Sequence, residues 1–205
     1  MGNKPNKGNP AHYTEEYKIT FDGFIKVGKT TLIKKYLEGK EYNESHDSFC
    51  ASYYTIFTFC FPKEGRNIGI SIYDCSINEN FLVAAAYVCR RTDVFIFIYD
   101  ITDKSSFLLI KKKIPKYKEK FEEKDAIIII VGNKIDLPRR EVERSDGENF
   151  AKEYNAYFVE TSTITGEGIN QVFDLSMNNI IQRIKNEYHP NKIKNINLED
   201  TQVPS

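Results

Sequence analysis

Eight residues near the start of the chain have the types and spacing of a loop that binds phosphate. Gly23-Phe24-Ile25-Lys26-Val27-Gly28-Lys29-Thr30 follows the pattern G-x-x-x-x-G-K-[ST]. Glycines let the backbone N–H groups of such a loop turn toward phosphate oxygens, and the following helix adds partial positive charge. We expect Lys29 to lie along the β and γ phosphates of a nucleotide and the Thr30 hydroxyl to bind Mg²⁺. A chance match of the fixed positions is expected in roughly one chain in a hundred or fewer.

A second candidate site follows the most apolar stretch of the sequence. Asn133-Lys134-Ile135-Asp136 comes about a hundred residues after the phosphate loop, where a buried strand is expected to end. The carboxylate of Asp136 can accept hydrogen bonds from both N1–H and the 2-amino group of guanine. Adenine does not offer these two donors in that arrangement, so the site would select guanine. Taken alone, these four residues could equally form a solvated turn.

A third segment completes the expected pocket. Glu160-Thr161-Ser162 follows the short strand-like stretch 157–159. Its backbone N–H groups could donate to the guanine carbonyl. Loops rich in Ser and Thr are common, so this segment is informative only together with the other two.

The elements that must position these residues alternate between strand and helix. Strand-like stretches are expected at 17–21, 52–61, 68–73, 94–99, 126–131 and 157–159. Helical periodicity is expected at 28–39, 105–121 and 169–184, with Pro115 kinking or shortening the second helix. Such alternation predicts a three-layer α/β fold with a mostly parallel sheet. A connection at 62–67 predicts one antiparallel edge pair, and 40–47 reads as a polar stretch.

Composition narrows the function classes. The chain has 205 residues, 29 basic against 29 acidic side chains and therefore a formal net charge of zero. This balance argues against bulk attraction to nucleic acid or to an anionic membrane. Four unevenly spaced cysteines without a C-x-x-C pair make a zinc site improbable. We expect one domain at 16–186, with flexible tails at 1–15 and 187–205.

The chain resembles the Ras-like small GTPases, and most closely the Rab branch. The phosphate loop, Tyr73-Asp74, Asn133–Asp136 and Glu160–Ser162 occur in the order and at the spacing of that family, and 99–107 resembles a Rab segment. The resemblance implies a P-loop G domain with a six-stranded sheet and about five helices. It also implies a monomeric GTP/GDP switch that uses Mg²⁺, hydrolyses GTP to GDP and phosphate, and acts in vesicle traffic through effector, exchange-factor and activating proteins.

The same resemblance assigns further site residues. Tyr42 lies near the family's aromatic residue at the guanine edge, and Asp74 would hold Mg²⁺ through water. Ser48 falls at the family's Mg²⁺-binding Thr, and Ser52 is the alternative if the loop carries a gap. The residues expected to bind nucleotide are Gly23, Ile25, Lys26, Val27, Gly28, Lys29, Thr30, Thr31, Tyr42, Asn133, Lys134, Asp136, Thr161, Ser162 and Thr163. Those expected to bind metal are Thr30, Ser48 and Asp74, and the catalytic pair is Lys29 and Asn78.

Departures from the family pattern cluster around the γ-phosphate. Ile77 stands where the family has a glycine, and Asn78 replaces the Gln that orients the attacking water. Ile25 and Lys26 stand where the family has small residues. We therefore expect slow or impaired GTP hydrolysis. The alternative is a degenerate relative that acts as an interaction scaffold, permanently bound to nucleotide or free of it; an adenine-specific kinase lacks support.

The two ends of the sequence bear on membrane attachment. No Cys follows Cys89, so prenylation is excluded for the sequence as given. Gly2 fits an N-myristoylation signal, but Asn6 stands where Ser or Thr is preferred. We expect a cytoplasmic protein, with membrane contact only through a partner or this weak acylation signal and with peripheral attachment to internal membranes as the alternative.

Overall fold

Two continuous apolar stretches form two interior strands of the sheet. The structure is a computed structural model that describes residues 15–40, 42–49, 52–63, 66–75, 89–120 and 126–187. β5 (Val94–Asp100) is buried throughout, and β6 (Ile127–Asn133) is buried from its second residue onward. Both strands pair with parallel neighbours, which explains why their sequences are continuously apolar instead of alternating.

The sheet has seven strands in the order β2-β3-β4-β1-β5-β6-β7. The other five strands are β1 (Glu15–Gly23), β2 (Asn43–Phe49), β3 (Ser52–Lys63), β4 (Arg66–Cys75) and β7 (Tyr157–Thr161). β1 is parallel to both β4 and β5, whereas β3 is antiparallel to both β2 and β4. The mostly parallel sheet with an antiparallel edge is therefore confirmed.

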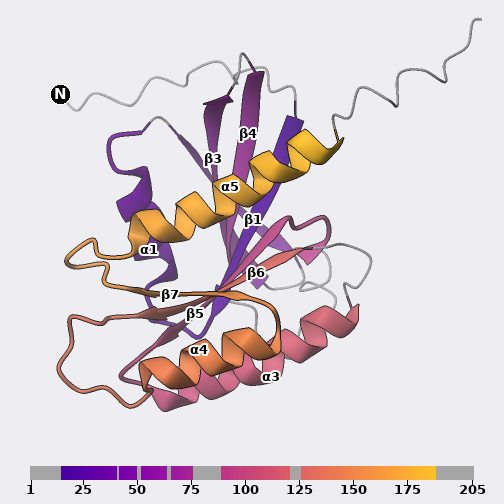
Figure 1. Ribbon diagram of the computed structural model, residues 1–205. Coiled ribbons are helices and arrows are strands. Elements are labelled where there is room, and N and C mark those ends of the chain that lie inside the picture. The colour runs from indigo at the N-terminus through magenta and orange to yellow at the C-terminus, as the bar shows by residue number, and fades with distance from the viewer. Residues whose placement is uncertain are drawn as a thin grey trace, which may run out of the picture.

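Helices cover both faces of this sheet. The described residues contain α1 (Lys29–Leu37), α3 (Lys104–Lys120), α4 (Arg144–Glu153) and α5 (Ile169–Glu187). α1 and α5 lie on one face, and α3 and α4 lie on the other (Figure 1). Alternate side chains of β5 enter the two cores: Ile96 packs in the cluster with α1 and α5, and Phe97 packs in the cluster with α3 and α4. The three-layer α/β class is confirmed.

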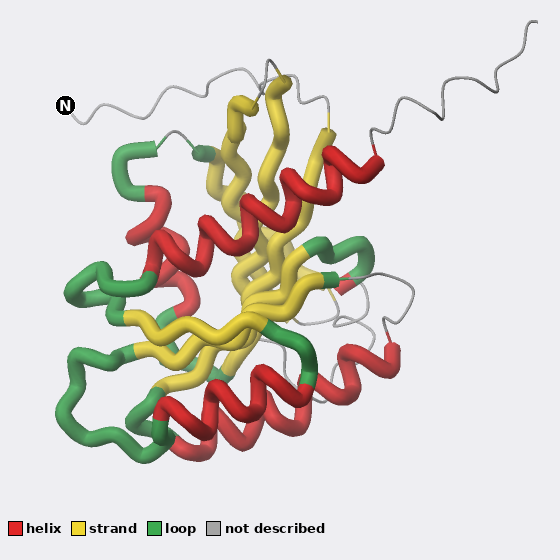
Figure 2. Tube along the Cα trace, in the orientation of Figure 1, coloured by secondary structure: helices red, strands yellow, loops and turns green. Residues whose placement is uncertain are grey.

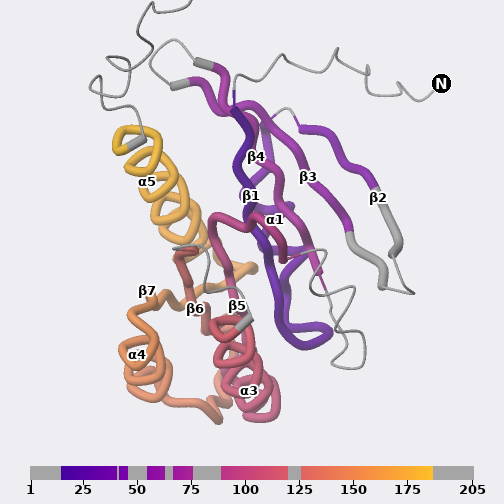
Figure 3. The backbone as a smooth tube through the Cα atoms, turned by 90° about the vertical axis from the view of Figure 1, so that its right-hand side faces the viewer, coloured from indigo at the N-terminus to yellow at the C-terminus, as the bar shows by residue number. Residues whose placement is uncertain are grey.

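The sequence-based expectation of six strands is wrong by one. β2 occupies most of the stretch that reads as a polar connection, and it pairs with β3 from Asn43 opposite Thr58 to Phe49 opposite Ser52. Figure 3 shows β2 at the outer edge of the sheet. An edge strand is held by main-chain hydrogen bonds on one side and can face solvent, so a polar sequence does not exclude it.

Pro115 does not end α3, which continues to Lys120. Ile110, Ile114 and Tyr117 of this helix are buried against the sheet, and this burial can offset the backbone hydrogen bond that proline removes. No helix in the described parts of the chain is long and apolar enough to span a membrane.

The parallel strands place their following loops at one edge of the sheet. The predicted phosphate loop (residues 23–30) begins at the last residue of β1 and ends in the first turn of α1. The predicted base loop (residues 133–136) begins at the last residue of β6. The loops that follow β6 and β7 both lie on the left of Figure 2. This edge is where ligands bind in open α/β sheets.

Candidate functional site

The two glycines of the phosphate loop lie where no side chain fits. A Cβ atom added to Gly23 would lie 2.2 Å from the carbonyl oxygen of Ile98. A Cβ atom at Gly28 would lie 2.4 Å from Nδ2 of Asn133, and Gly28 also has a φ of 103°, which favours glycine. The loop is therefore packed directly against β5 and against the base loop.

Lys29 is the first residue of α1, and its side chain turns back into the phosphate loop. Its ammonium donates to the carbonyl oxygens of Gly23 at 3.0 Å and Phe24 at 2.7 Å. The residue is only 5% exposed. Burial lowers the pKa of Lys29, and the nearby carboxylate of Asp74 opposes that shift. These contacts place a buried positive charge inside the loop.

Thr30 and Asp74 bring two oxygen groups together beside this charge. The Thr30 hydroxyl donates to Oδ2 of Asp74, which lies near the end of β4. Burial raises the pKa of Asp74, whereas the Thr30 hydrogen bond and the Lys29 charge lower it. No group of three or more His, Cys, Asp or Glu side chains that could hold a metal occurs among the described residues. One hydroxyl and one carboxylate suit Mg²⁺, which typically takes few protein ligands and shares substrate phosphates.

Asn133 joins three separate segments of the chain. Its Nδ2 atom donates to the carbonyl oxygen of Val27 in the phosphate loop at 2.8 Å. Its Oδ1 atom accepts from the Thr161 hydroxyl at the end of β7 at 2.9 Å. Asn133 and Thr161 have no exposed surface. The phosphate loop, the base loop and the end of β7 are therefore locked together through one side-chain amide.

Asp136 is held in place by Ser162. The Ser162 hydroxyl donates to Oδ1 of Asp136 at 2.6 Å and accepts from the backbone N–H groups of Ile164 and Thr165. Ser162 is fully buried, whereas Asp136 is exposed. The backbone N–H of Ser162 donates to the carbonyl of Glu167 at 3.0 Å. The structure therefore gives the Ser162 side chain a positioning contact that the sequence did not predict, since only its backbone was expected to contribute.

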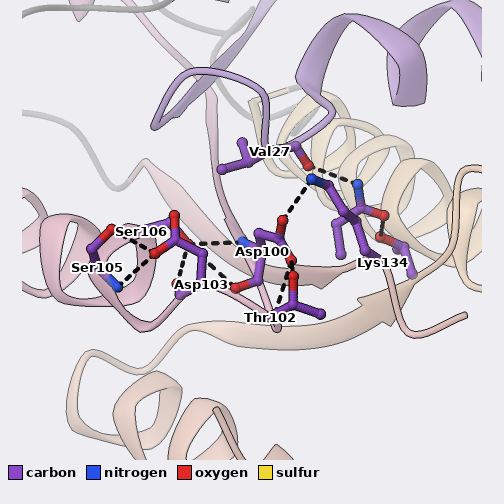
Figure 4. Close-up of polar contacts among 9 residues, drawn as sticks. Val27, Asp100, Thr102, Asp103, Ser105, Ser106 and Lys134 are labelled. Carbon is purple, nitrogen blue, oxygen red and sulfur yellow. Dashed lines mark hydrogen bonds and ion pairs between the residues drawn. The ribbon is translucent and has the colours of Figure 1, made fainter. Parts of the chain in front are cut away.

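Asp100 is a member of the site that the residue pattern did not assign. Its Oδ2 atom pairs with the Lys134 ammonium at 2.5 Å, and its Oδ1 atom accepts from both the backbone and the hydroxyl of Thr102. Figure 4 shows Asp100 and Lys134 in one polar cluster with Val27. Burial works to raise the pKa of Asp100, but the hydrogen bonds from Lys134 and Thr102 outweigh it and hold that pKa below its ordinary value. The sequence offered one indication of this role: Asp100 is a carboxylate at the end of a continuously apolar stretch.

The remaining predicted residues of the phosphate loop lie at its surface or in its support. Ile25 is 58% exposed, and Lys26 is exposed with a left-handed φ of 63°. Thr31 is exposed on α1, whereas Val27 is buried and offers its carbonyl to Asn133. The side chain of Lys26 is therefore accessible to solvent.

The structure describes only in part the residues that were assigned through the family resemblance. The Tyr42 ring, 38% exposed, lies 5.9 Å between centroids from Phe57 of β3. The backbone of Ser48 belongs to β2, opposite Tyr53, and Ser52 is the first residue of β3. The side chains of Ser48 and Ser52 lie outside what the structure describes, as do Ile77 and Asn78.

The last predicted contact residue links the loop after β7 to the phosphate loop. Thr163 is half-buried, and its Cγ2 atom lies 4.0 Å from the place that a Cβ of Gly28 would occupy. Together with Asn133 and Ser162, this contact brings the phosphate loop and both base segments to one place.

Comparison with known proteins agrees with this geometry. The sequence model of the Ras family matches residues 18–182. The chain belongs to the Ras family. It is also 30% identical over 181 residues to Ras-related protein RabJ of Dictyostelium discoideum, covering 88% of this chain and 69% of that protein. The resemblance to Rab-like small GTPases is therefore confirmed, and membership places the chain among GTP-binding switches that hydrolyse GTP.

Proposed function

We propose that the chain is a Rab-like switch that binds GTP and GDP with Mg²⁺ at the loops joined by Asn133 and acts in vesicle or membrane traffic. The observation that supports this most directly is the pair of hydrogen bonds from Asn133 to Val27 and from Thr161 to Asn133. These bonds join the predicted phosphate loop and the predicted base loop at one edge of the sheet. A single guanosine phosphate can then contact both.

Each of these residues has a role in the proposed site. The loop backbone and the Lys29 ammonium would bind the β and γ phosphates, because both offer positive charge in a buried setting. Asp136, positioned by Ser162, would accept from N1–H and the 2-amino group of guanine. Thr30 and Asp74, with Ser48, would hold Mg²⁺, which supplies charge neutralisation on the phosphates when bound.

We further propose that intrinsic hydrolysis is slow. Water must attack the γ-phosphorus in line and displace GDP, and Lys29 stabilises the charge that develops on the phosphate oxygens. Asn78 replaces a longer Gln side chain for orienting that water, and Ile77 disfavours the positive φ that a glycine allows. In the phosphate loop, Ile25 has an exposed apolar side chain. A single-turnover assay that gave ordinary Ras-like rates would contradict this proposal.

The alternative proposal is a scaffold that holds nucleotide permanently or not at all. Ile25, Ile77 and Asn78 favour it, because all three weaken the response to the γ-phosphate. Under either proposal, effector, exchange-factor and activating proteins are expected partners. The protein is expected to be a cytoplasmic monomer, with membrane contact through a partner or through acylation of Gly2.

The deciding experiment identifies the nucleotide that the purified protein carries and then changes Asp136. We expect guanosine phosphates in the native protein. The variant Asp136→Asn should lose GDP affinity by about 100-fold or more, because two hydrogen bonds to a charged acceptor are lost. The same variant should gain affinity for xanthosine diphosphate, since the new amide can donate to the oxygen at position 2.

A matched control is Asp174→Asn, at an exposed position on α5. It should leave both affinities within about twofold of the native values. Adenosine phosphates in the native protein, or an Asp136→Asn variant with unchanged GDP affinity, would contradict guanine recognition at this site.

A further inference from the structure

A charged cluster lies in the core directly behind the phosphate loop. Asp22, the residue before Gly23 on β1, has no exposed surface. Lys113 of α3 is 6% exposed, and its ammonium lies 3.0 Å from Oδ1 and 3.1 Å from Oδ2 of Asp22. The Tyr117 hydroxyl, one turn further along α3, donates to Oδ2 at 3.0 Å. The central strand of the sheet is thereby tied to a helix 91 residues away by an ion pair.

The carboxylate of Asp22 is fully used by these contacts. Oδ1 accepts from the backbone N–H of Gly23 at 2.7 Å and from Lys113, and Oδ2 accepts from Lys113 and Tyr117. Burying two charges costs several kcal/mol even when they are paired, and well-packed apolar residues are often as stable or more stable. Stability alone is therefore a weak reason for an ion pair at this position.

The cluster contacts the phosphate loop at Gly23, the residue that Lys29 also contacts. The N–H of Gly23 donates to Asp22, while the carbonyl of Gly23 accepts from the Lys29 ammonium. Gly23 is thus held through its N–H by Asp22 and through its carbonyl by Lys29. Asp22 and Lys113 also act on Lys29 with opposite signs: the carboxylate raises the pKa of Lys29, and the Lys113 ammonium lowers it. A change in the charge of either residue therefore changes the electrostatic potential at Lys29 in the phosphate loop.

We propose that Asp22 and Lys113 form a buried positioning pair that ties α3 to the phosphate loop and whose charge balance sets how fast the chain releases its nucleotide. The inference rests on the proposed nucleotide-binding function. The carboxylate of Asp22 alone would repel the phosphates through the low-dielectric core, and Lys113 cancels that repulsion. The two charges of the pair therefore cancel at the nucleotide. Loss of the Asp22 charge should slow nucleotide release, and loss of the Lys113 charge should speed it.

The sharpest test is Asp22→Asn, because it changes charge with little change in shape. The Asn Oδ1 atom can still accept from Gly23 and Lys113. Its Nδ2 atom can donate to the Tyr117 oxygen, but it also replaces the oxygen that accepted from Lys113 at 3.1 Å, so one hydrogen bond from the ammonium is lost. Lys113 then no longer faces the negative charge of Asp22, so we expect GDP to leave on the order of tenfold more slowly than from the native chain. The melting temperature of the variant should nevertheless fall, because a buried ion pair has lost one of its two charges.

Lys113→Met leaves the opposite charge beneath the loop. We expect GDP release on the order of tenfold faster than native, again with a lower melting temperature. The double variant Asp22→Asn, Lys113→Met removes both charges and should release GDP within about twofold of the native rate. Lys112→Met makes the same substitution at the neighbouring, exposed position of α3 and should change neither quantity.

Release is measured by stopped-flow or filter assay on full-length protein purified with fluorescent GDP bound, because bound ligand supports a weakened fold. Opposite shifts in the two single variants support the inference, and Asp22→Asn decides alone if Lys113→Met does not fold. Equal rates, or a shift in the same direction for both, would overturn it, since a purely structural pair would behave in that way. A native chain that carries no guanine nucleotide would instead overturn the proposed function, and this inference with it.

Discussion

The amide of Asn133 offers the most direct test of the candidate site. In Asn133→Asp the shape of the side chain is kept, but the Nδ2 donor becomes a carboxylate oxygen that faces the carbonyl of Val27. The packing leaves little room for adjustment, because a Cβ atom at Gly28 would already lie 2.4 Å from Nδ2. The variant therefore replaces a buried hydrogen bond with two facing acceptors.

The size of the effect follows from these contacts. Loss of the donor leaves a buried carbonyl of Val27 unsatisfied, which costs about 1–3 kcal/mol. The new buried charge adds to this cost, whereas the retained bond from Thr161 becomes charge-assisted and recovers part of it. We expect the free energy of unfolding to fall by about 2–4 kcal/mol. GDP affinity should fall at least about tenfold, because the carboxylate both loosens the phosphate loop and repels the phosphates.

Asn179→Asp is a matched control on α5. The Nδ2 atom of Asn179 also donates to a backbone carbonyl, that of Leu175 at 2.7 Å, but this residue is half-buried and lies outside the candidate site. Calorimetric titration with GDP and denaturant unfolding should be run on both variants. Equal GDP affinities in Asn133→Asp and Asn179→Asp would refute the reasoning, since the amide would then stabilise the fold without aligning the loops.

Two further predictions concern strain and pH. Lys26→Gly should raise the free energy of unfolding by up to about 1 kcal/mol, because Lys26 is exposed and has a left-handed φ of 63°. Lys26→Ala keeps that backbone strain and should not stabilise the fold. If thermal melts showed Lys26→Ala to be as strongly stabilised as Lys26→Gly, backbone strain would be ruled out as the cause. Burial raises the pKa of Cys89 from 9.0 to about 12, so this thiol keeps its proton in the fold when the unfolded chain has lost it. The contribution of the protonated thiol to the free energy of unfolding is fully present below pH 9. It is lost as the pH rises toward 12, by up to about 1.4 kcal/mol per pH unit. In denaturant titrations across this pH range, the free energy of unfolding of Cys89→Ser should fall less steeply with pH than that of the native chain, by that amount. Equal pH dependence in the native chain and the variant would contradict the prediction.

The parallel half of the fold could be predicted because its signals are local. The buried runs that became β5 and β6 are apolar throughout, and the polar residues at their ends mark the edge where the site lies. β2 could not be predicted in this way, because Asn43–Phe49 has neither an apolar run nor an alternating pattern. Its strand conformation comes from pairing with β3, which is a tertiary effect.

The same distinction separates the parts of the site. Fixed spacing identified Lys29, Asn133 and Asp136, because each is required by the chemistry of a bound phosphate or base. The contacts of Asp100 with Lys134 and of Ser162 with Asp136 depend on how strands far apart in sequence meet. A pattern along the chain does not report such distances.

The ion pair of Asp22 and Lys113 could not be predicted from the sequence either. It matters for the proposed switch because it would affect nucleotide release. A carboxylate at the end of a buried strand looks like a solvated turn residue until the helix that carries Lys113 is placed behind it. If hydrolysis is as slow as we propose, the time that GTP stays bound depends mainly on the rate of release. That rate is the quantity that the charge balance of Asp22 and Lys113 would set, whereas the proposal of slow hydrolysis rests on other residues, Ile25, Ile77 and Asn78. The two properties can therefore vary independently, and a chain with weak hydrolysis can still exchange its nucleotide.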